Sequence, residues 1–499
     1  MKNKRIALLC AAFTAGVTVS ACGNSVNTEE LPEPEWTGEY NYEDDIVTYT
    51  AYDTLEASYR GTNSTGMLIE NEAAVEAAKV EVSKKSSNSS IRTLNDLYGL
   101  GSAILVKNGS FTAEGSGGKI ETDASGAAAI YVYESGSVSV TDTEIDTVGI
   151  YSPALQLRTA EGNPDAYLEH ALIYTSGRVS PGIKTVGDVG VNVKDSYIQT
   201  SAKSSPAIIA SGNLQADSTT AVAKGSEVLQ VEGESVAWLE EMTLSARQKG
   251  SNPEGFNYGI LLYSEDEKAD PEVQSTELDL VKSDYTNERG NAFYVTNTEA
   301  WLNIDSTSIT SVDGIGARSL ASDTDDTEGT EDTEASGETA KETTSDTDTD
   351  SGDEADAGTD ACFIRVSGND SGWGETGSNG GSLKVNYSEI DVNGNVVVDA
   401  ISTLELYIYN GSIWTGTILT DNSLSGGVDG DGDVTVSLSA GSTWTVTNDC
   451  TLDRFCGAGE LVDADGRTVS LVGTDGTVYI SGDSPITVTT GSYDVNDLF

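Results

Sequence analysis

A small residue followed at once by an aliphatic residue recurs along the first half of this 499-residue chain. These marks follow one another at steps of 26, 25, 28 and 25 residues, at Ala103-Ile104, Ala129-Ile130, Ala154-Leu155, Gly182-Ile183 and Ala207-Ile208. Each of the last three marks comes directly after a Ser-Pro dipeptide. Self-similarity at a period of roughly 20 to 50 residues is typical of solenoids, in which each repeat buries its apolar side chains against the next.

A second pattern divides each repeat into short strands. Two apolar residues lie five positions apart around a turn, and the second comes ten residues before the next mark, as in Val140/Ile145, Leu168/Ile173 and Val193/Ile198. Short runs in which apolar and polar residues alternate are typical of β-strands, whose side chains point alternately to opposite faces. The sequence therefore predicts an all-β fold, a right-handed parallel β-helix with three short strands in each coil.

The inward-facing residues of successive coils should form a column. We expect this column to run through Ile120, Ile145, Ile173, Ile198, Val222, Leu244, Leu278 and Ile309. Later in the chain the five-residue spacing returns at Val385/Ile390 and Ile408/Ile413, which lie 23 residues apart. Stacked coils would bury these side chains and satisfy the backbone hydrogen bonds above and below each strand.

The amino terminus has the pattern of an export signal. Lys2, Lys4 and Arg5 precede an apolar run that is too short for a stable transmembrane span. The end of this run, Val19-Ser20-Ala21-Cys22, resembles the lipobox of bacterial lipoproteins. The resemblance implies that residues 1–21 are removed and that Cys22 is lipidated, which would anchor the protein to the outer side of a cell membrane. An ordinary signal peptide with an incidental cysteine is the alternative.

Composition divides the remainder of the chain. Residues 321–361 are almost entirely Asp, Glu, Thr, Ser and Gly, and such a segment cannot bury enough apolar surface to become ordered. Residues 73–79 favour a helix by propensity, but Val75/Val80 also fits the strand spacing. We expect a flexible tether at 22–45, an N-terminal cap and imperfect first coil at 46–102, β-helix at 103–320, a disordered acidic insertion at 321–361, and β-helix with a C-terminal cap at 362–499.

Charge limits the partners of the protein. The formal net charge is −54, with 81 acidic residues against 27 Lys and Arg. Such a chain is repelled by nucleic acid and by anionic surfaces, so nucleic-acid binding is excluded. Divalent cations, cationic ligands and neutral glycans remain as ligand classes.

The coil pattern resembles that of right-handed β-helices in pectate lyases and in autotransporter passenger domains, over roughly residues 100 to 490. The stretch Ala440-Gly441-Ser442-Thr443-Trp444-Thr445-Val446 is similar to strands near the carboxyl end of adhesin-like passenger domains. The resemblance implies the fold, and it allows both enzymes and binding proteins, because one scaffold carries many functions.

Catalytic signatures are absent from the sequence. Polygalacturonase-like enzymes carry an Asn-Thr-Asp, an Asp-Asp pair, a Gly-His-Gly and an Arg-Ile-Lys, and this chain has none of these as a set. The single histidine, His170, is expected at a solvated turn, and Glu240-Glu241 is one of many chance acidic pairs. We therefore assign no catalytic residue; a polysaccharide lyase or glycoside hydrolase remains the alternative to a binding protein.

One acidic turn is a candidate metal site. Asp429, Asp431 and Asp433 alternate with glycine, and carboxylate oxygens in a glycine-rich turn can gather around Ca²⁺. Position 440, where an EF-hand would need an acid, is Ala440. Ca²⁺ is thus the one candidate cofactor, and a plain acidic turn is the alternative.

Aromatic side chains occupy strand positions next to inward aliphatics and are therefore expected to face outward. The candidate ligand-binding residues are Tyr131, Tyr133, Tyr407, Tyr409 and Trp414. Exposed rings on a flat lateral face can stack on sugars or dock a protein. The predicted function is adhesion or recognition of a glycan or host surface protein by a lipid-anchored protein; the further alternative is a purely structural envelope component.

Overall fold

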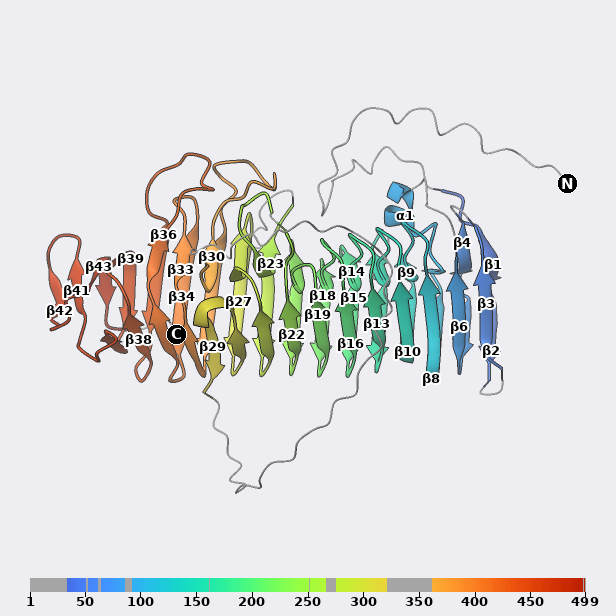
Figure 1. The fold of residues 1–499 in the computed structure, drawn as a ribbon, viewed down its shortest axis with the longest axis horizontal. Coiled ribbons are helices and arrows are strands. Elements are labelled where there is room, and N and C mark those ends of the chain that lie inside the picture. The colour runs from blue at the N-terminus through green and yellow to red at the C-terminus, as the bar shows by residue number, and fades with distance from the viewer. Residues whose placement is uncertain are drawn as a thin grey trace, which may run out of the picture.

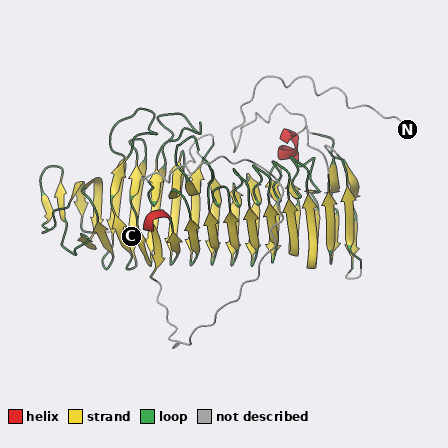
Figure 2. Ribbon diagram, in the orientation of Figure 1, coloured by secondary structure: helices red, strands yellow, loops and turns green. Residues whose placement is uncertain are grey.

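The computed structural model describes residues 34–50, 53–61, 64–85, 92–160, 162–250, 252–265, 275–320, 361–496 and 498. The chain forms an all-β protein whose parallel strands stack into one elongated array (Figures 1 and 2). This arrangement is compatible with a β-helix. Within the described ranges, no helix is long and apolar enough to cross a membrane.

One face of the array is a sheet of 13 strands, all paired in parallel with their neighbours. We call it the first sheet. In order across the sheet its strands are β1 (Gly38–Glu43), β4 (Thr65–Glu70), β7 (Ile104–Lys107), β9 (Ile130–Tyr133), β11 (Leu155–Arg158), β14 (Ile183–Val186), β17 (Ile208–Ala210), β20 (Leu229–Glu232), β23 (Tyr258–Tyr263), β26 (Asn291–Thr296), β30 (Ile364–Val366), β33 (Val396–Val398) and β36 (Ile418–Thr420).

A second ladder of strands runs beside it. It contains β2 (Ile46–Tyr49), β5 (Ala74–Ala77), β8 (Ser110–Thr122), β10 (Ser137–Thr147), β12 (Asp165–Glu169), β15 (Gly190–Lys194), β18 (Asn213–Asp217), β21 (Val236–Glu240), β24 (Thr276–Val281), β27 (Glu299–Asp305), β31 (Ser382–Ser388), β34 (Thr403–Tyr409), β37 (Asp433–Leu438), β39 (Cys450–Gly457), β43 (Thr487–Asp494), β41 (Ser470–Gly473) and β42 (Val478–Ile480). Its pairs are parallel except β41 with β42, which forms an antiparallel end to the array.

The third ladder shares the long strands β8 and β10 with the second. Its other members are β3 (Leu55–Tyr59), β6 (Val80–Lys84), β13 (Leu172–Thr175), β16 (Tyr197–Thr200), β19 (Thr220–Ala223), β22 (Thr243–Ala246), β25 (Asp284–Asn287), β28 (Ser308–Thr310), β29 (Gly316–Ser319), β32 (Ile390–Asn393), β35 (Ile413–Gly416), β38 (Thr443–Val446) and β40 (Glu460–Val462). Strand β29 pairs antiparallel with both neighbours. Two short helices are described, α1 (Arg92–Tyr98) and the 3₁₀ turn η2 (Val312–Gly314).

The predicted column of inward residues is confirmed in the first half of the chain. Ile145 pairs with Ile120 on one side and with Ile173 on the other, and Ile173 pairs with Ile198. All four side chains are buried in one continuous apolar core. The small-aliphatic marks also stack in register, from Ile104 through Ile208 along the first sheet.

The predicted column is wrong at two later positions. Ala221, and not Val222, pairs with Ile198, because a slip of one residue along a strand turns a side chain to the opposite face. Tyr285 occupies the place predicted for Leu278, which lies in the second ladder instead. The segment between β23 and β24 lengthens this repeat, so a count from the preceding repeat reaches the wrong strand.

In the later repeats, the residues that the five-residue spacing would place opposite each other are not strand partners. Ile408 pairs with Tyr387, and Val385 pairs with Leu406, because β31 and β34 are each seven residues long and offer several inward positions. Trp414 pairs with Val392 and faces the core. The strand assignments of these segments are nevertheless confirmed.

The Ser-Pro marks have a structural explanation. The backbone N–H of Ser152 donates to Ser180 Oγ at 3.0 Å, and the N–H of Ser180 donates to Ser205 Oγ at 3.0 Å. Each hydroxyl in turn donates to a carbonyl of the preceding repeat, as Ser180 Oγ does to Gly149 O at 2.9 Å. The serines are buried, so these bonds satisfy polar groups that would otherwise destabilise the core.

Several predicted boundaries can be compared with the strands. Strand β1 lies inside the segment predicted as a tether, so regular structure begins earlier than expected. Residues 74–77 and 80–84 are strands, which confirms the strand interpretation of that segment over the helical one. The signal segment with Cys22, the first part of the tether and residues 321–360 of the acidic insertion lie outside the described residues.

Candidate functional site

Two tryptophans stand on the outer face of the second ladder. Trp238 on β21 is 41% exposed and Trp301 on β27 is 39% exposed. In β21 the flanking Ala237 and Leu239 are buried in the core, so strand alternation directs Trp238 outward. The same alternation holds for Trp301 in β27. Single exposed apolar side chains are common on protein surfaces, so what matters is whether these rings lie close to other groups that could bind a ligand.

A pair of carboxylates separates the two indoles. Strand β24 lies between β21 and β27, with Asp279 opposite Trp238 and Glu277 opposite Trp301. Leu278 between them faces the core, so both acids point to the outer side of the ladder, where Glu277 is partly exposed and Asp279 is only 8% exposed. Adjacent strands lie about 4.8 Å apart, which places each carboxylate beside an indole. We call Trp238, Glu277, Asp279 and Trp301 the Trp–acid face.

The electrostatics of this pair differ from those of ordinary surface acids. Burial raises the pKa of Glu277, and the neighbouring charge of Asp279 raises it further. Burial also raises the pKa of Asp279, although the Asn303 side chain opposes this by donating to its Oδ1 at 2.6 Å. Asn386 donates to Asn303 in the next strand. The row of amides thus fixes the Asp279 carboxylate in place.

The indole of Trp301 already holds a cation. The Lys384 ammonium on β31 lies 4.8 Å from the centroid of this ring, and its Nζ is 3.9 Å from Glu405 Oε1. The strand register places Lys384 opposite Trp301 on one side and opposite Glu405 on the other. A cation over an indole is attracted by the negative face of the ring. The Trp–acid face can therefore offer rings for stacking, carboxylates as hydrogen-bond acceptors, and indole faces for cations.

The predicted exposure of Tyr131 and Tyr133 is wrong. Both point away from the main core, but helix α1 covers them, and Tyr131 is 0% exposed. Its hydroxyl donates to the Asp96 carbonyl of the helix at 2.7 Å. The sequence pattern gave the direction of these side chains correctly but could not show that a neighbouring segment packs over them.

The other predicted aromatic residues divide between core and surface. Trp414 faces the core, where its ring stacks on that of Trp444 at 4.7 Å, so its predicted exposure is wrong. Tyr407 and Tyr409 are partly exposed on β34. Tyr407 stands opposite Asn386, so it continues the amide row that leads from Asp279. The structure thus places one predicted residue near the Trp–acid face.

The predicted Ca²⁺ residues lie in and beside an exposed turn. Thr420 Oγ1 donates to Asp431 Oδ1 at 3.0 Å, while Asp433 begins β37. Burial raises the pKa of Asp433, and the charges of Asp453 and Glu405 add to this. Within the described part of the chain, Asp429, Asp431 and Asp433 do not form a group whose ligand atoms all lie within 4.8 Å of one another.

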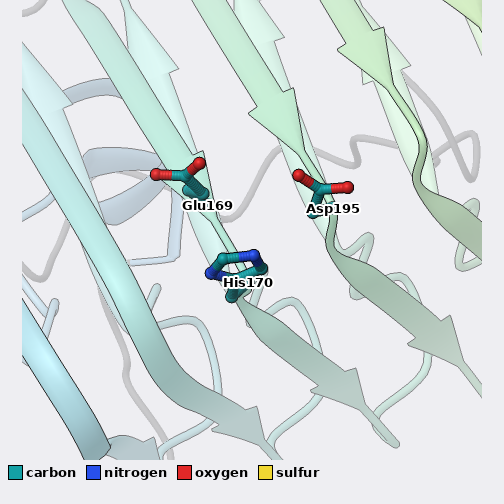
Figure 3. A group of neighbouring side chains, drawn as sticks. All are labelled: Glu169, His170 and Asp195. Atoms are coloured by element: carbon teal, nitrogen blue, oxygen red, sulfur yellow. The ribbon is translucent and has the colours of Figure 1, made fainter.

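A different trio does meet that distance. Glu169, His170 and Asp195 have ligand atoms within 4.8 Å of one another at one corner of the array (Figure 3). His170 follows β12 with a φ of 50°, and Asp195 occupies the same corner after β15 with a φ of 47°. His170 Nδ1 also lies 3.5 Å from Asp142 Oδ1. His170 is exposed, as expected from the sequence, and the trio is a solvated corner of successive repeats.

Comparison with known proteins gives no assignment. No protein-family model matches the sequence, and no curated protein matches it either. A functional conclusion therefore depends on the geometry of the Trp–acid face.

The sequence contained a signal for the two tryptophans that our prediction missed. Trp238 lies in Val236-Ala237-Trp238-Leu239, where small or aliphatic residues alternate around it, and Trp301 has the same neighbours, Ala300 and Leu302. Alternation alone would have placed both rings outside. The carboxylates between them could not be found this way, because the repeat from β21 to β24 is longer than the earlier repeats and its register cannot be counted from them.

Proposed function

We propose that the protein is an extracytoplasmic, lipid-anchored right-handed parallel β-helix that binds a glycan on its Trp–acid face. The observation that carries this proposal is the placement of two exposed indoles on either side of a carboxylate pair. Indole faces stack well against the apolar faces of pyranose rings, and carboxylates accept hydrogen bonds from sugar hydroxyls. The face lies on regular strands, which hold such groups in fixed positions.

The scaffold part of the proposal has separate support. Three parallel ladders, visited in turn by the chain, favour a helical path, and crossovers between parallel strands are overwhelmingly right-handed. The lipobox-like Cys22 supports an anchor at the membrane. Metabolic labelling with a fatty-acid probe tests this anchor: label should enter the intact protein, and Cys22→Ser should abolish it. Labelling that persists in this variant would place the modification elsewhere.

A glycan array followed by titration calorimetry tests the binding function. We expect binding to at least one oligosaccharide class, and we expect the Trp238→Ala/Trp301→Ala double variant to lose it. Tyr479→Ala is the matched control, because Tyr479 is 36% exposed near the far end of the array. Absence of binding across the array would overturn the proposal and leave a protein ligand or a structural role. Chromatography of the incubated oligosaccharides should show them intact; shortened products would favour the hydrolase or lyase alternative.

A further inference from the structure

We infer, building on the proposed glycan-binding function, that the Trp–acid face selects a polysaccharide whose sugars carry free, protonated amino groups. The ligand would place pyranose rings on Trp238 and Trp301 and direct amines towards Glu277 and Asp279. Ring stacking and amine recognition then come from adjacent strands of one ladder.

The first argument is the charge of the face. Two acids occupy alternate outward positions of one strand, and Glu299 on β27 is a further acid on an outward position two residues from Trp301. Mutual repulsion and burial disfavour the ionised pair. A cation placed between the carboxylates relieves both effects, whereas a neutral hydroxyl can only supply a hydrogen bond. Uronic-acid polymers would meet repulsion here and from the net charge of −54.

The second argument is that the protein contains an internal example of the contact. Lys384 places an ammonium over Trp301 while it lies near the Glu405 carboxylate. The strand neighbours of Trp238 are Gln215 and Asp279, so a carboxylate stands beside this indole without a lysine at the paired positions. Trp238 and Asp279 lie on adjacent strands with no strand between them, so an amine of the ligand would reach the indole and the carboxylate from the solvent side and make the same two kinds of contact that Lys384 makes with Trp301 and Glu405.

The third argument is spacing. Trp238 and Trp301 lie two strands apart, about 9.6 Å across the ladder, and two residues apart along the strand direction, about 6.6 Å, so their positions are separated diagonally by about 12 Å. An extended polysaccharide that crosses the strands obliquely, with two to three linked pyranose rings, spans this distance. An extended, stiff chain can therefore contact both indoles at once, and a rigid ligand loses less conformational entropy on binding. A lysine-rich peptide could supply amines but has no ring faces for the two indoles.

The test compares three hexasaccharides with the same extended linkage: one of glucosamine, one of N-acetylglucosamine and one of glucose. Affinities for the full-length protein are measured by calorimetry at a pH low enough for the amines to be charged and high enough for Glu277 and Asp279 to be ionised. We expect the glucosamine hexamer to bind at least tenfold more tightly than either neutral hexamer. We also expect this preference to shrink as salt rises, because the contacts between amines and carboxylates are screened.

Variants test whether the Trp–acid face causes the preference for the glucosamine hexamer. Glu277→Gln/Asp279→Asn should reduce affinity for the glucosamine hexamer to that of the neutral hexamers. Glu56→Gln/Glu460→Gln removes the same charge at two exposed strand positions elsewhere and should leave the preference unchanged. Lys384→Ala should tighten amine binding severalfold, since it frees the ring of Trp301. Thermal unfolding checks that each variant is folded.

The outcomes separate the inference from the proposed function. Equal affinity for all three hexamers would overturn the selection of amines and leave glycan binding intact. Loss of the preference in the remote control variant would also overturn it, since the effect would then come from net charge. Binding of polylysine as tightly as the glucosamine hexamer, with no need for the indoles, would overturn the choice of a glycan. Failure of every sugar on the array would overturn the proposed function itself.

Discussion

Outward-pointing aromatic residues are covered on the first sheet, whereas on the second ladder two of them are exposed. On the first sheet, Tyr131 and Tyr133 are sealed beneath helix α1, and Tyr263 packs under Trp373 from the segment after β30. On the second ladder, no segment among the described residues covers Trp238 and Trp301 in this way, and they are about two-fifths exposed. Strand alternation is the same on both surfaces. The difference lies in the segments that connect the strands.

Connection length explains the contrast. The longer connections between β6 and β7, β22 and β23, and β30 and β31 supply residues that pack over the first sheet. Between the second and third ladders the chain turns at tight corners, where single residues such as Asp195 and Glu241 adopt positive φ. A one-residue corner contributes nothing that could cover a face. Aromatic residues beside such corners are therefore available to a ligand.

Truncation of a covered ring should have the largest effect. Tyr131→Ala should lower the free energy of unfolding by about 3–5 kcal/mol, because it leaves a cavity beneath α1. Trp238→Ala should lower it by less, about 1 kcal/mol, since the side chain is two-fifths exposed and its removal leaves no closed cavity. Urea unfolding followed by circular dichroism measures both. Tyr131→Phe is the control, and it should cost about 1 kcal/mol through the lost hydrogen bond to Asp96. Equal destabilisation by both alanine variants would contradict the contrast.

For glycan binding the order of the effects should be reversed: truncation of an exposed ring should matter more than a change to the covered Tyr131. Trp238→Ala and Trp301→Ala should each weaken glycan affinity about tenfold, which corresponds to about 1.4 kcal/mol. Tyr131→Phe should leave the affinity unchanged. Calorimetric titration of all three variants provides the measurement. An unchanged affinity after both tryptophan substitutions would place the glycan on another surface.

Acid should weaken amine binding before it unfolds the protein. The pKa values of Glu277 and Asp279 are raised, so these carboxylates become neutral at a higher pH than exposed acids, which titrate near about 4. Affinity for a glucosamine oligomer should fall severalfold as the pH drops through this raised range, while the amines stay charged. The charged groups on the adjoining strands are Glu240 on β21 and Glu299 and Asp305 on β27, and Lys384 lies one strand further away on β31. If the Glu277→Gln/Asp279→Asn variant showed the same dependence of affinity on pH, other groups would be responsible for it.

Weakening the contact between helix α1 and the first sheet should have the smallest effect on stability. Lys184 Nζ lies 2.6 Å from Asp96 Oδ1 and ties α1 to β14. Lys184→Met should lower stability by less than about 1 kcal/mol, because the pair is partly exposed. Hydrogen exchange should nevertheless become faster in residues 92–98 and stay unchanged in β21. Uniform acceleration across both regions would show that the pair supports more than the local cover.

The sequence predicted the repeat and its early register because the repeats from Ile104 to Ile208 have nearly constant length. The prediction lost register at Val222 and Leu278, where repeat lengths change, and a slip of one residue reverses every side chain. For the same reason Trp414 was expected outside and lies inside. Burial of Tyr131 depends on packing between distant segments, which periodicity does not contain. Trp238 and Trp301 were within reach of the alternation rule, whereas their pairing with Glu277 and Asp279 required the three-dimensional register.

The column of serines at Ser152, Ser180 and Ser205 has a consequence for how such a chain can change length. Each serine brings both its own donor and its own acceptor, so every copy carries a complete connection to the copies on either side. A duplicated segment could be spliced into the stack with its buried polar atoms already matched. Insertion of a whole repeat then lengthens each ladder by one strand and leaves the existing repeats undisturbed. The length of the molecule can therefore change in steps of one repeat.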